Sequence, residues 1–152
     1  GYTYKGAFNM LAVLASIAMR FVAGKASDRH GRVPLMVLGA WMLAAGMYLL
    51  ATATDQTSAA IAGVVYGLSV GINMPTVFAW TADMAKPGKI ALALGTMLMA
   101  LELGIGFGAF LSWALYEGVL ERIPMIYKMA AAVAAVSGLA LSVHGWRLKR
   151  GS

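Results

Sequence analysis

The stretch from residue 24 to residue 32 concentrates charge between two apolar segments. Lys25, Asp28, Arg29 and Arg32 are four charged residues out of nine, in a chain of which only 12% of the residues are charged. The Asp28 carboxylate can pair with the nearby guanidinium groups, or it can cap the helix that follows. We therefore expect a short charged loop here, whose ion pairs can hold two helix ends together.

The spacing of this stretch resembles the G-x-x-x-D-R-x-G-R signature of the major facilitator superfamily of secondary transporters. The matching residues are Gly24, Asp28, Arg29, Gly31 and Arg32. In that family the signature joins the second helix to the third, and again the eighth to the ninth. The resemblance implies that the loop is a conformational latch, which joins cytoplasmic helix ends in one state and releases them in another.

Glu102 is an acidic residue near the middle of a long apolar segment. An ionised carboxylate at the centre of a bilayer costs about 2.5 kcal/mol or more, so it must be paired, solvated in a cavity, or protonated with a raised pKa. A group of this kind could couple transport to protons if it faced each side of the membrane in turn. The alternative is a protonated glutamic acid that donates one structural hydrogen bond.

Another apolar segment contains a motif typical of serine hydrolases, but its position inside a membrane span argues against hydrolysis. Residues 67–71 match the G-x-S-x-G nucleophile motif at Ser69, and His144 could serve as the base of an intramembrane serine protease. The motif requires a strand-to-helix elbow, and His144 lies near a membrane surface while Ser69 lies near mid-membrane. The chain also lacks cysteine. We therefore expect no enzyme activity, no metal and no cofactor.

These residues must be positioned by membrane-spanning helices. Hydrophobic residues make up 61% of the chain, and the mean hydropathy is +0.76. Each of five apolar segments is long enough to cross a bilayer as a helix. The sequence predicts an all-α, polytopic membrane protein with a partial major facilitator fold in a single transmembrane domain, with spans at about 4–24, 33–53, 58–82, 88–117 and 123–147.

The third span has two different faces at helical spacing. One is polar and aromatic and carries Tyr66, Ser69, Asn73, Thr76 and Trp80. We expect this face, with Asn9 and Arg20 of the first span, to line a translocation pathway. Interhelical hydrogen bonding is the alternative. The other face should pack closely against a neighbouring helix, as should part of the fourth span; the glycines concerned are Gly63, Gly67, Gly71, Gly104 and Gly108.

Basic residues predict the orientation. The connections after the first and third spans and the C-terminal tail are basic, whereas the connection after the second span has no basic residue. This alternation places the N-terminus outside and the C-terminus in the cytoplasm, in the inner (plasma) membrane. The excess of 12 basic over 6 acidic residues is therefore assigned to membrane orientation, and not to nucleic-acid binding.

The chain begins without methionine and reaches its first helix at once, which favours a fragment of a twelve-helix transporter. The resemblance favours the C-terminal half, helices eight to twelve, because arginine and Gly-Pro features of the other half are missing. We expect alternating-access transport of a small solute, coupled to protons, as efflux or uptake. The expected partners are the lipid bilayer, the solute, protons and the missing N-terminal helices. A membrane scaffold or subunit that transports nothing is the alternative.

Overall fold

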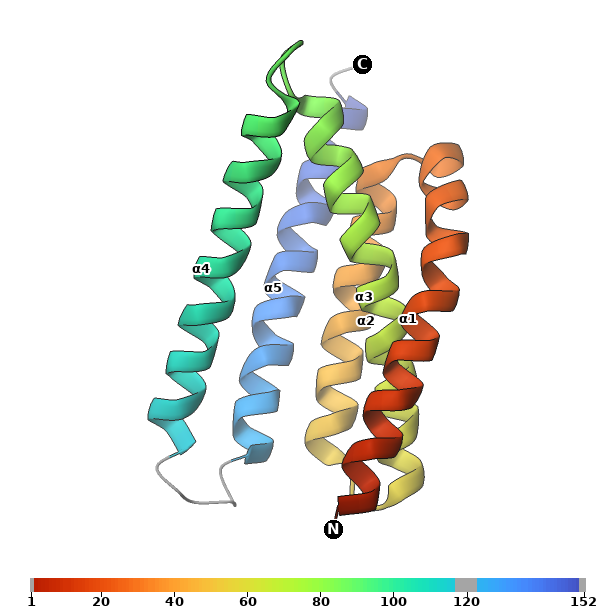
Figure 1. Cartoon of the computed structure of the whole chain (residues 1–152), viewed down its shortest axis with the longest axis vertical. Coiled ribbons are helices and arrows are strands. Elements are labelled where there is room, and N and C mark those ends of the chain that lie inside the picture. The colour runs from red at the N-terminus through yellow and green to blue at the C-terminus, as the bar shows by residue number, and fades with distance from the viewer. Residues whose placement is uncertain (1, 117–122, 151–152) are drawn as a thin grey trace.

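The protein is an elongated helical bundle in the computed structural model (Figure 1). The structure describes residues 2–116 and 123–150, with side chains placed for residues 6, 8–115 and 123–146. The described residues form five helices: α1 (Tyr2–His30), α2 (Arg32–Thr52), α3 (Gln56–Met84), α4 (Ile90–Tyr116) and α5 (Ile123–Arg150). All five are long and apolar enough to cross a membrane.

The prediction of a charged loop at residues 24–32 is wrong, because residues 24–30 are helical. The first helix continues to His30, and α2 begins two residues later at Arg32. Only Gly31 interrupts the helices, with a φ of 87° that favours glycine. Lys25, Ala26 and Arg29 have good helix propensity and no proline lies between residues 24 and 30, so the helix can extend past the apolar span. The signature is therefore a helix end followed by a one-residue corner.

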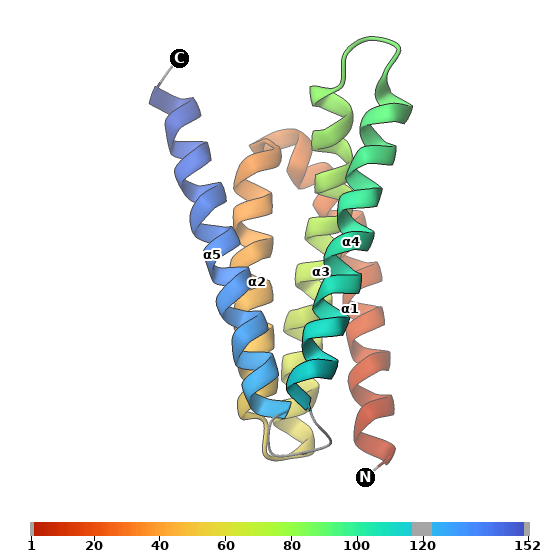
Figure 2. The same ribbon diagram turned by 90° about the vertical axis from the view of Figure 1, so that its left-hand side faces the viewer.

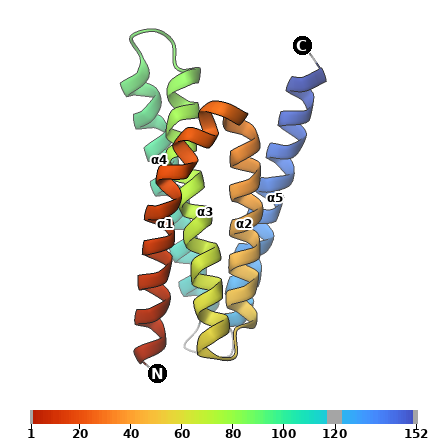
Figure 3. The same cartoon turned by 90° about the vertical axis from the view of Figure 1, so that its right-hand side faces the viewer.

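The third helix is the centre of the bundle. It packs along both α1 and α2, and α2 packs in turn along α5. Figure 3 shows α1, α3, α2 and α5 side by side in that order. Contact with α1 is closest at Gly63, Gly67 and Gly71, where a Cβ atom would meet Phe8, Ala12 or Ser16. These glycines allow the two helix backbones to approach each other.

The fourth helix lies at the margin of the bundle, at the left in Figure 1 and toward the viewer in Figure 2. It makes only limited contact with α3 and α5. No residue from Ile90 to Leu115 is buried, although this helix is highly apolar. Leu103, Phe107 and Trp113 are among its large exposed side chains. Most of its surface is therefore available to lipid or to other protein.

The ends of the helices fall into two groups. The α1–α2 corner, the α3–α4 turn and the end of α5 lie at one end of the bundle, and the start of α1 and the α2–α3 connection lie at the other (Figure 1). At this second end, Asp55 caps α3 by accepting a hydrogen bond from the Ser58 amide at 3.0 Å. Hydrogen bonds from the Ser58 hydroxyl and the Ser58 amide hold the pKa of Asp55 below its ordinary value.

Candidate functional site

One arginine joins three helices at the first end of the bundle. Arg32, at the start of α2, donates through Nη1 to Asp28 Oδ1 of α1 at 2.6 Å. Its Nε donates to Asp83 Oδ2 of α3 at 3.0 Å. Ser27 Oγ also accepts from Nη1, at 2.8 Å. We call Ser27, Asp28, Arg32 and Asp83 the charged junction.

The local backbone places these groups together. The Gly31 amide donates to the Ser27 carbonyl at 3.1 Å, which closes the last turn of α1. The positive φ of Gly31 then turns the chain directly into α2. Asp28 and Arg32 are thereby brought within hydrogen-bonding distance across the corner. Of the two roles that the sequence left open for Asp28, pairing with a guanidinium is the one observed: Asp28 pairs with Arg32, while Gly31 occupies the N-cap position of α2 without a side-chain cap.

The charged junction lies over a small cavity of about 210 Å³ between α1, α2 and α3. Gly24, Asp28 and Arg32 line it together with Pro75 and Thr76 of α3. A Cβ atom at Gly24 would meet no other atom within 4 Å. Arg29, the remaining signature residue, is exposed and takes no part in the ion pairs of the described residues.

A larger groove of about 650 Å³ runs between α4 and the helices α2, α3 and α5. Its walls are mainly aliphatic and aromatic, and the polar side chains on them are Asn73, Ser112 and Ser137. Asn73 also lines a second cavity of about 160 Å³ between α3 and α4. It is therefore the residue of the polar α3 face that borders both spaces beside α4.

The other polar residues of that face do not line these two spaces, although the Asn73 amide donates to Ser69 Oγ at 3.5 Å. Ser69 is fully buried and donates to the Gly39 carbonyl of α2 at 3.1 Å. Thr76 is also buried and donates to the Ile72 carbonyl of its own helix at 2.6 Å. Tyr66 stacks on Phe8 of α1 with ring centroids 6.2 Å apart. The contacts of Ser69 and Tyr66 connect helices, and for Ser69 this is the interhelical hydrogen bond that the sequence left open as the alternative.

Three further predicted pathway residues lie apart from the groove. Trp80 is half-buried, and Asn9 and Arg20 of α1 are exposed. None of the three lines the 650 Å³ groove. Their assignment to the pathway stays a prediction.

Glu102 is exposed on α4 and does not face Asn73. It lines a separate hollow of about 710 Å³ with Leu98, Met99, Leu103, Gly106 and Phe107. Among the residues that the structure describes, Phe107 alone lines both the groove and this hollow. Gly104 and Gly108 face the groove, and a Cβ atom at either would meet nothing within 4 Å in the described structure. The packing role predicted for these two glycines stays a prediction.

The arrangement of Ser69 and His144 gives no support to a protease. Ser69 Oγ is occupied with the Gly39 carbonyl between α3 and α2, while His144 is exposed on α5. No strand-to-helix elbow surrounds Ser69, because α3 is helical on both sides of it.

Sequence reasoning missed two members of the charged junction, Ser27 and Asp83. Asp83 lies 51 residues after Arg32, near the end of α3. The available signal was an acidic residue at a helix end, next to a basic connection. Its partner could not be inferred from the sequence, because the pairing depends on how the helices pack.

The chain resembles known transport proteins. Residues 2–150 match the profile described as Major Facilitator Superfamily. A triacylglyceride transporter of Mycolicibacterium smegmatis is 33% identical over 103 residues, covering 68% of this chain and 18% of the relative. Multidrug resistance protein 1 of Bacillus subtilis is 29% identical, covering 75% of the chain and 29% of the relative. Facilitated glucose transporter member 10 of Danio rerio is 24% identical, covering 74% of the chain and 21% of the relative. The match thus spans less than a third of each relative.

Proposed function

Since this chain belongs to the Major Facilitator Superfamily, we propose that it supplies five helices of a transporter that moves a small apolar or amphipathic solute by alternating access. Membership of the family makes the chain part of a multi-pass membrane protein of solute transport, and not an enzyme. The mechanism, the solute and the coupling are the proposed part.

The proposed mechanism rests on the geometry of the charged junction. A single guanidinium joins α1, α2 and α3 at one end of the bundle, and Asp28 and Asp83 are 69% and 57% exposed. At such exposure each ion pair contributes about 0.2–1 kcal/mol. That energy is too small to determine the fold and large enough to bias two conformations of similar energy. The charged junction therefore acts as the latch.

The groove beside α4 supports the choice of solute. Its walls are apolar and its polar side chains are few, which suits a ligand that is mostly hydrocarbon with one or two hydrogen-bonding groups. Two of the relatives are named for triacylglycerides and for multidrug resistance. Asn73, with one donor and one acceptor group, is the residue that would orient the solute.

Glu102 is the proposed proton-coupling residue. Its carboxyl group lies near the middle of α4 among Leu98, Met99 and Leu103, where an ionised form needs a partner or water. Protonation when this surface meets lipid, and ionisation when it meets water or a basic partner, would link the proton to the conformational change. The cost of the unpaired charge supports this role.

We assign the chain to helices eight to twelve, with the charged junction on the cytoplasmic side of the plasma membrane and the start of α1 outside. The basic residues at the end of the bundle that holds the α1–α2 corner and the α3–α4 turn support this orientation. The solute cavity of such a transporter is completed by its other helices.

Cysteine labelling of the full-length transporter tests the pathway. Asn73→Cys should react with a water-soluble maleimide and be protected by transported solute, because it borders the groove. Ile72→Cys is the matched control, since Ile72 is the neighbouring residue and is fully buried. Equal labelling of both positions, or labelling of position 72 alone, would overturn the assignment.

A further inference from the structure

The turn between α3 and α4 holds two lysines in a fixed arrangement. Lys86, Pro87, Gly88 and Lys89 form it, and the Lys89 amide donates to the Lys86 carbonyl at 2.9 Å. Gly88 has a φ of 75°. Proline at the second position and glycine with positive φ at the third define a type II turn. Its two ends lie within about 7 Å of each other, so the two lysine side chains start close together.

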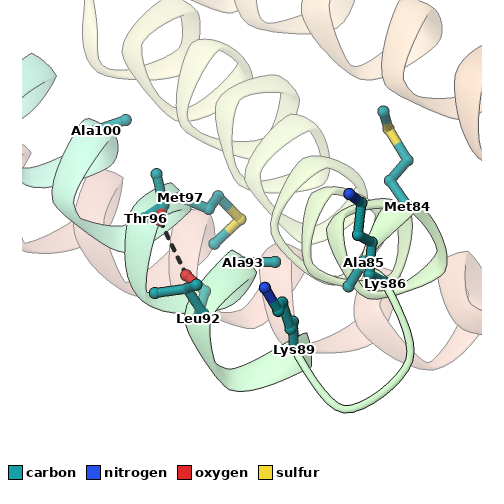
Figure 4. A pocket seen from close by; sticks show the side chains of 9 residues that line it. All are labelled: Met84, Ala85, Lys86, Lys89, Leu92, Ala93, Thr96, Met97 and Ala100. Carbon is teal, nitrogen blue, oxygen red and sulfur yellow. Dashed lines mark hydrogen bonds between the residues drawn. The ribbon is translucent and has the colours of Figure 1, made fainter.

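These lysines form one end of a cavity of about 510 Å³ between the end of α3 and the start of α4. Figure 4 shows Lys86 and Lys89 at the turn, with Ala93 and Met97 farther along α4. The remaining lining residues are Met84, Ala85, Leu92, Thr96 and Ala100. From Leu92 to Ala100 the wall extends along α4 by about 12 Å.

Apart from the two ammonium groups, the cavity offers little polar chemistry. The Thr96 hydroxyl donates to the Leu92 carbonyl of its own helix at 2.9 Å. No acidic side chain is among the described residues that line the cavity. The nearest carboxylate in sequence, Asp83, accepts from Arg32 at 3.0 Å. The positive charge of Lys86 and Lys89 is therefore not balanced by the walls of the cavity.

We propose that this cavity binds an anionic phospholipid, with the phosphate between Lys86 and Lys89 and an acyl chain along α4. At the end of the helices, the two lysines supply positive charge for a phosphate. The apolar wall continues from there toward the middle of the helices. Basic pockets of this kind between membrane helices suit lipid head groups. A soluble anion would pair with the lysines but would leave the apolar wall exposed to water.

The site has a structural consequence for α4. That helix has no buried residue between Ile90 and Leu115, and near the turn Thr81 Oγ1 of α3 contacts Met97 Sδ of α4 at 3.2 Å. A bound acyl chain would fill the space on this side of Met97. The lipid would thus complete the packing between α3 and α4, whatever solute is transported.

Native mass spectrometry of the delipidated full-length protein tests the proposal. We expect dioleoyl phosphatidylglycerol to remain bound under conditions that remove dioleoyl phosphatidylcholine. The Lys86→Gln/Lys89→Gln double variant should bind phosphatidylglycerol about twenty-five-fold more weakly, since each lysine near a membrane surface contributes about fivefold. The Lys86→Arg/Lys89→Arg variant should keep the binding, which separates loss of charge from misfolding.

Lys25→Gln is the matched control, because Lys25 is an exposed lysine at the same end of the bundle and does not line the cavity. It should bind phosphatidylglycerol like the unaltered protein. Equal affinity of the double glutamine variant would overturn the site. Equal binding of the two lipids would overturn the charge requirement. Displacement of the lipid by inorganic phosphate at equal concentration would show that the apolar wall contributes nothing, and would overturn the lipid.

Discussion

Arg32 of α2 donates through Nε to Asp83 of α3 at 3.0 Å, across 51 residues of sequence. The same guanidinium also holds Asp28 of α1. Only Gly31 separates α1 from α2, so the Asp28–Arg32 pair spans a one-residue corner. The Arg32–Asp83 contact joins residues far apart in the sequence, and in the proposed latch it is the ion pair that we expect to break.

Asp83→Asn should alter transport without unfolding the protein. The substitution removes one exposed ion pair worth about 0.2–1 kcal/mol, so the balance of two states should change by up to about fivefold. The measurement is the initial transport rate of the reconstituted full-length protein, with thermal unfolding measured in parallel. Asp55→Asn, at the other end of the bundle, should leave transport unchanged because asparagine also caps helices. Equal effects of the two substitutions would remove the special role of Asp83.

Gly67→Ala should destabilise the contact between α1 and α3. The added Cβ atom would overlap the Ala12 carbonyl oxygen, and the backbones must separate to admit it. Overpacking of this kind costs about 1–3 kcal/mol. Gly138→Ala is the control, because its Cβ atom would lie at an ordinary 3.4 Å from Trp41. Thermal unfolding in detergent compares the two. A loss at position 138 as large as that at position 67 would contradict the packing account.

Glu102→Gln should uncouple transport from the proton gradient, since glutamine cannot release a proton. Transport driven by the solute gradient alone should persist. The measurement is solute flux in proteoliposomes with and without an imposed pH gradient. Glu102→Asp, which keeps the carboxyl group, should retain coupling. If the glutamine variant responded to the gradient like the unaltered protein, Glu102 would have only a structural role.

Asp55, at the other end of the bundle, predicts that the stability of the protein depends on pH. Its pKa is lowered in the folded state by hydrogen bonds from Ser58. Its stabilising effect is therefore fully present above the ordinary aspartate pKa of about 3.9, and is lost as the pH falls through the lower folded value. The difference in unfolding temperature between the unaltered protein and Asp55→Ala should be constant above about pH 5 and shrink below about pH 4. A constant difference down to pH 2 would contradict the capping role.

The sequence predicted much of the fold because hydropathy sets the helices. Four of the five helices begin and end within a few residues of the predicted spans. The exception is the first, where the charged residues 25–30 were interpreted as a loop but form the end of α1. Charge alone does not end a helix, and the break falls at Gly31, where positive φ is required.

The site was harder to predict, because periodicity groups residues on a face without giving their neighbours. Ser69 and Asn73 are four residues apart on α3 and both contact Gly39 of α2, yet Ser69 is fully buried there while Asn73 also borders the spaces beside α4. Likewise, the pairing of Arg32 with Asp83 depends on the packing of α2 against α3, which no local pattern contains.

The most direct test of the account is the side from which the groove can be labelled. In the full-length protein carrying Asn73→Cys, an impermeant maleimide is applied to each side of sealed vesicles, with Arg32 intact or replaced by glutamine. Loss of both ion pairs should shift the ratio of labelling from the two sides by about two- to thirtyfold, at unchanged thermal stability. An unchanged ratio would contradict the claim that the charged junction sets the balance between the two conformations.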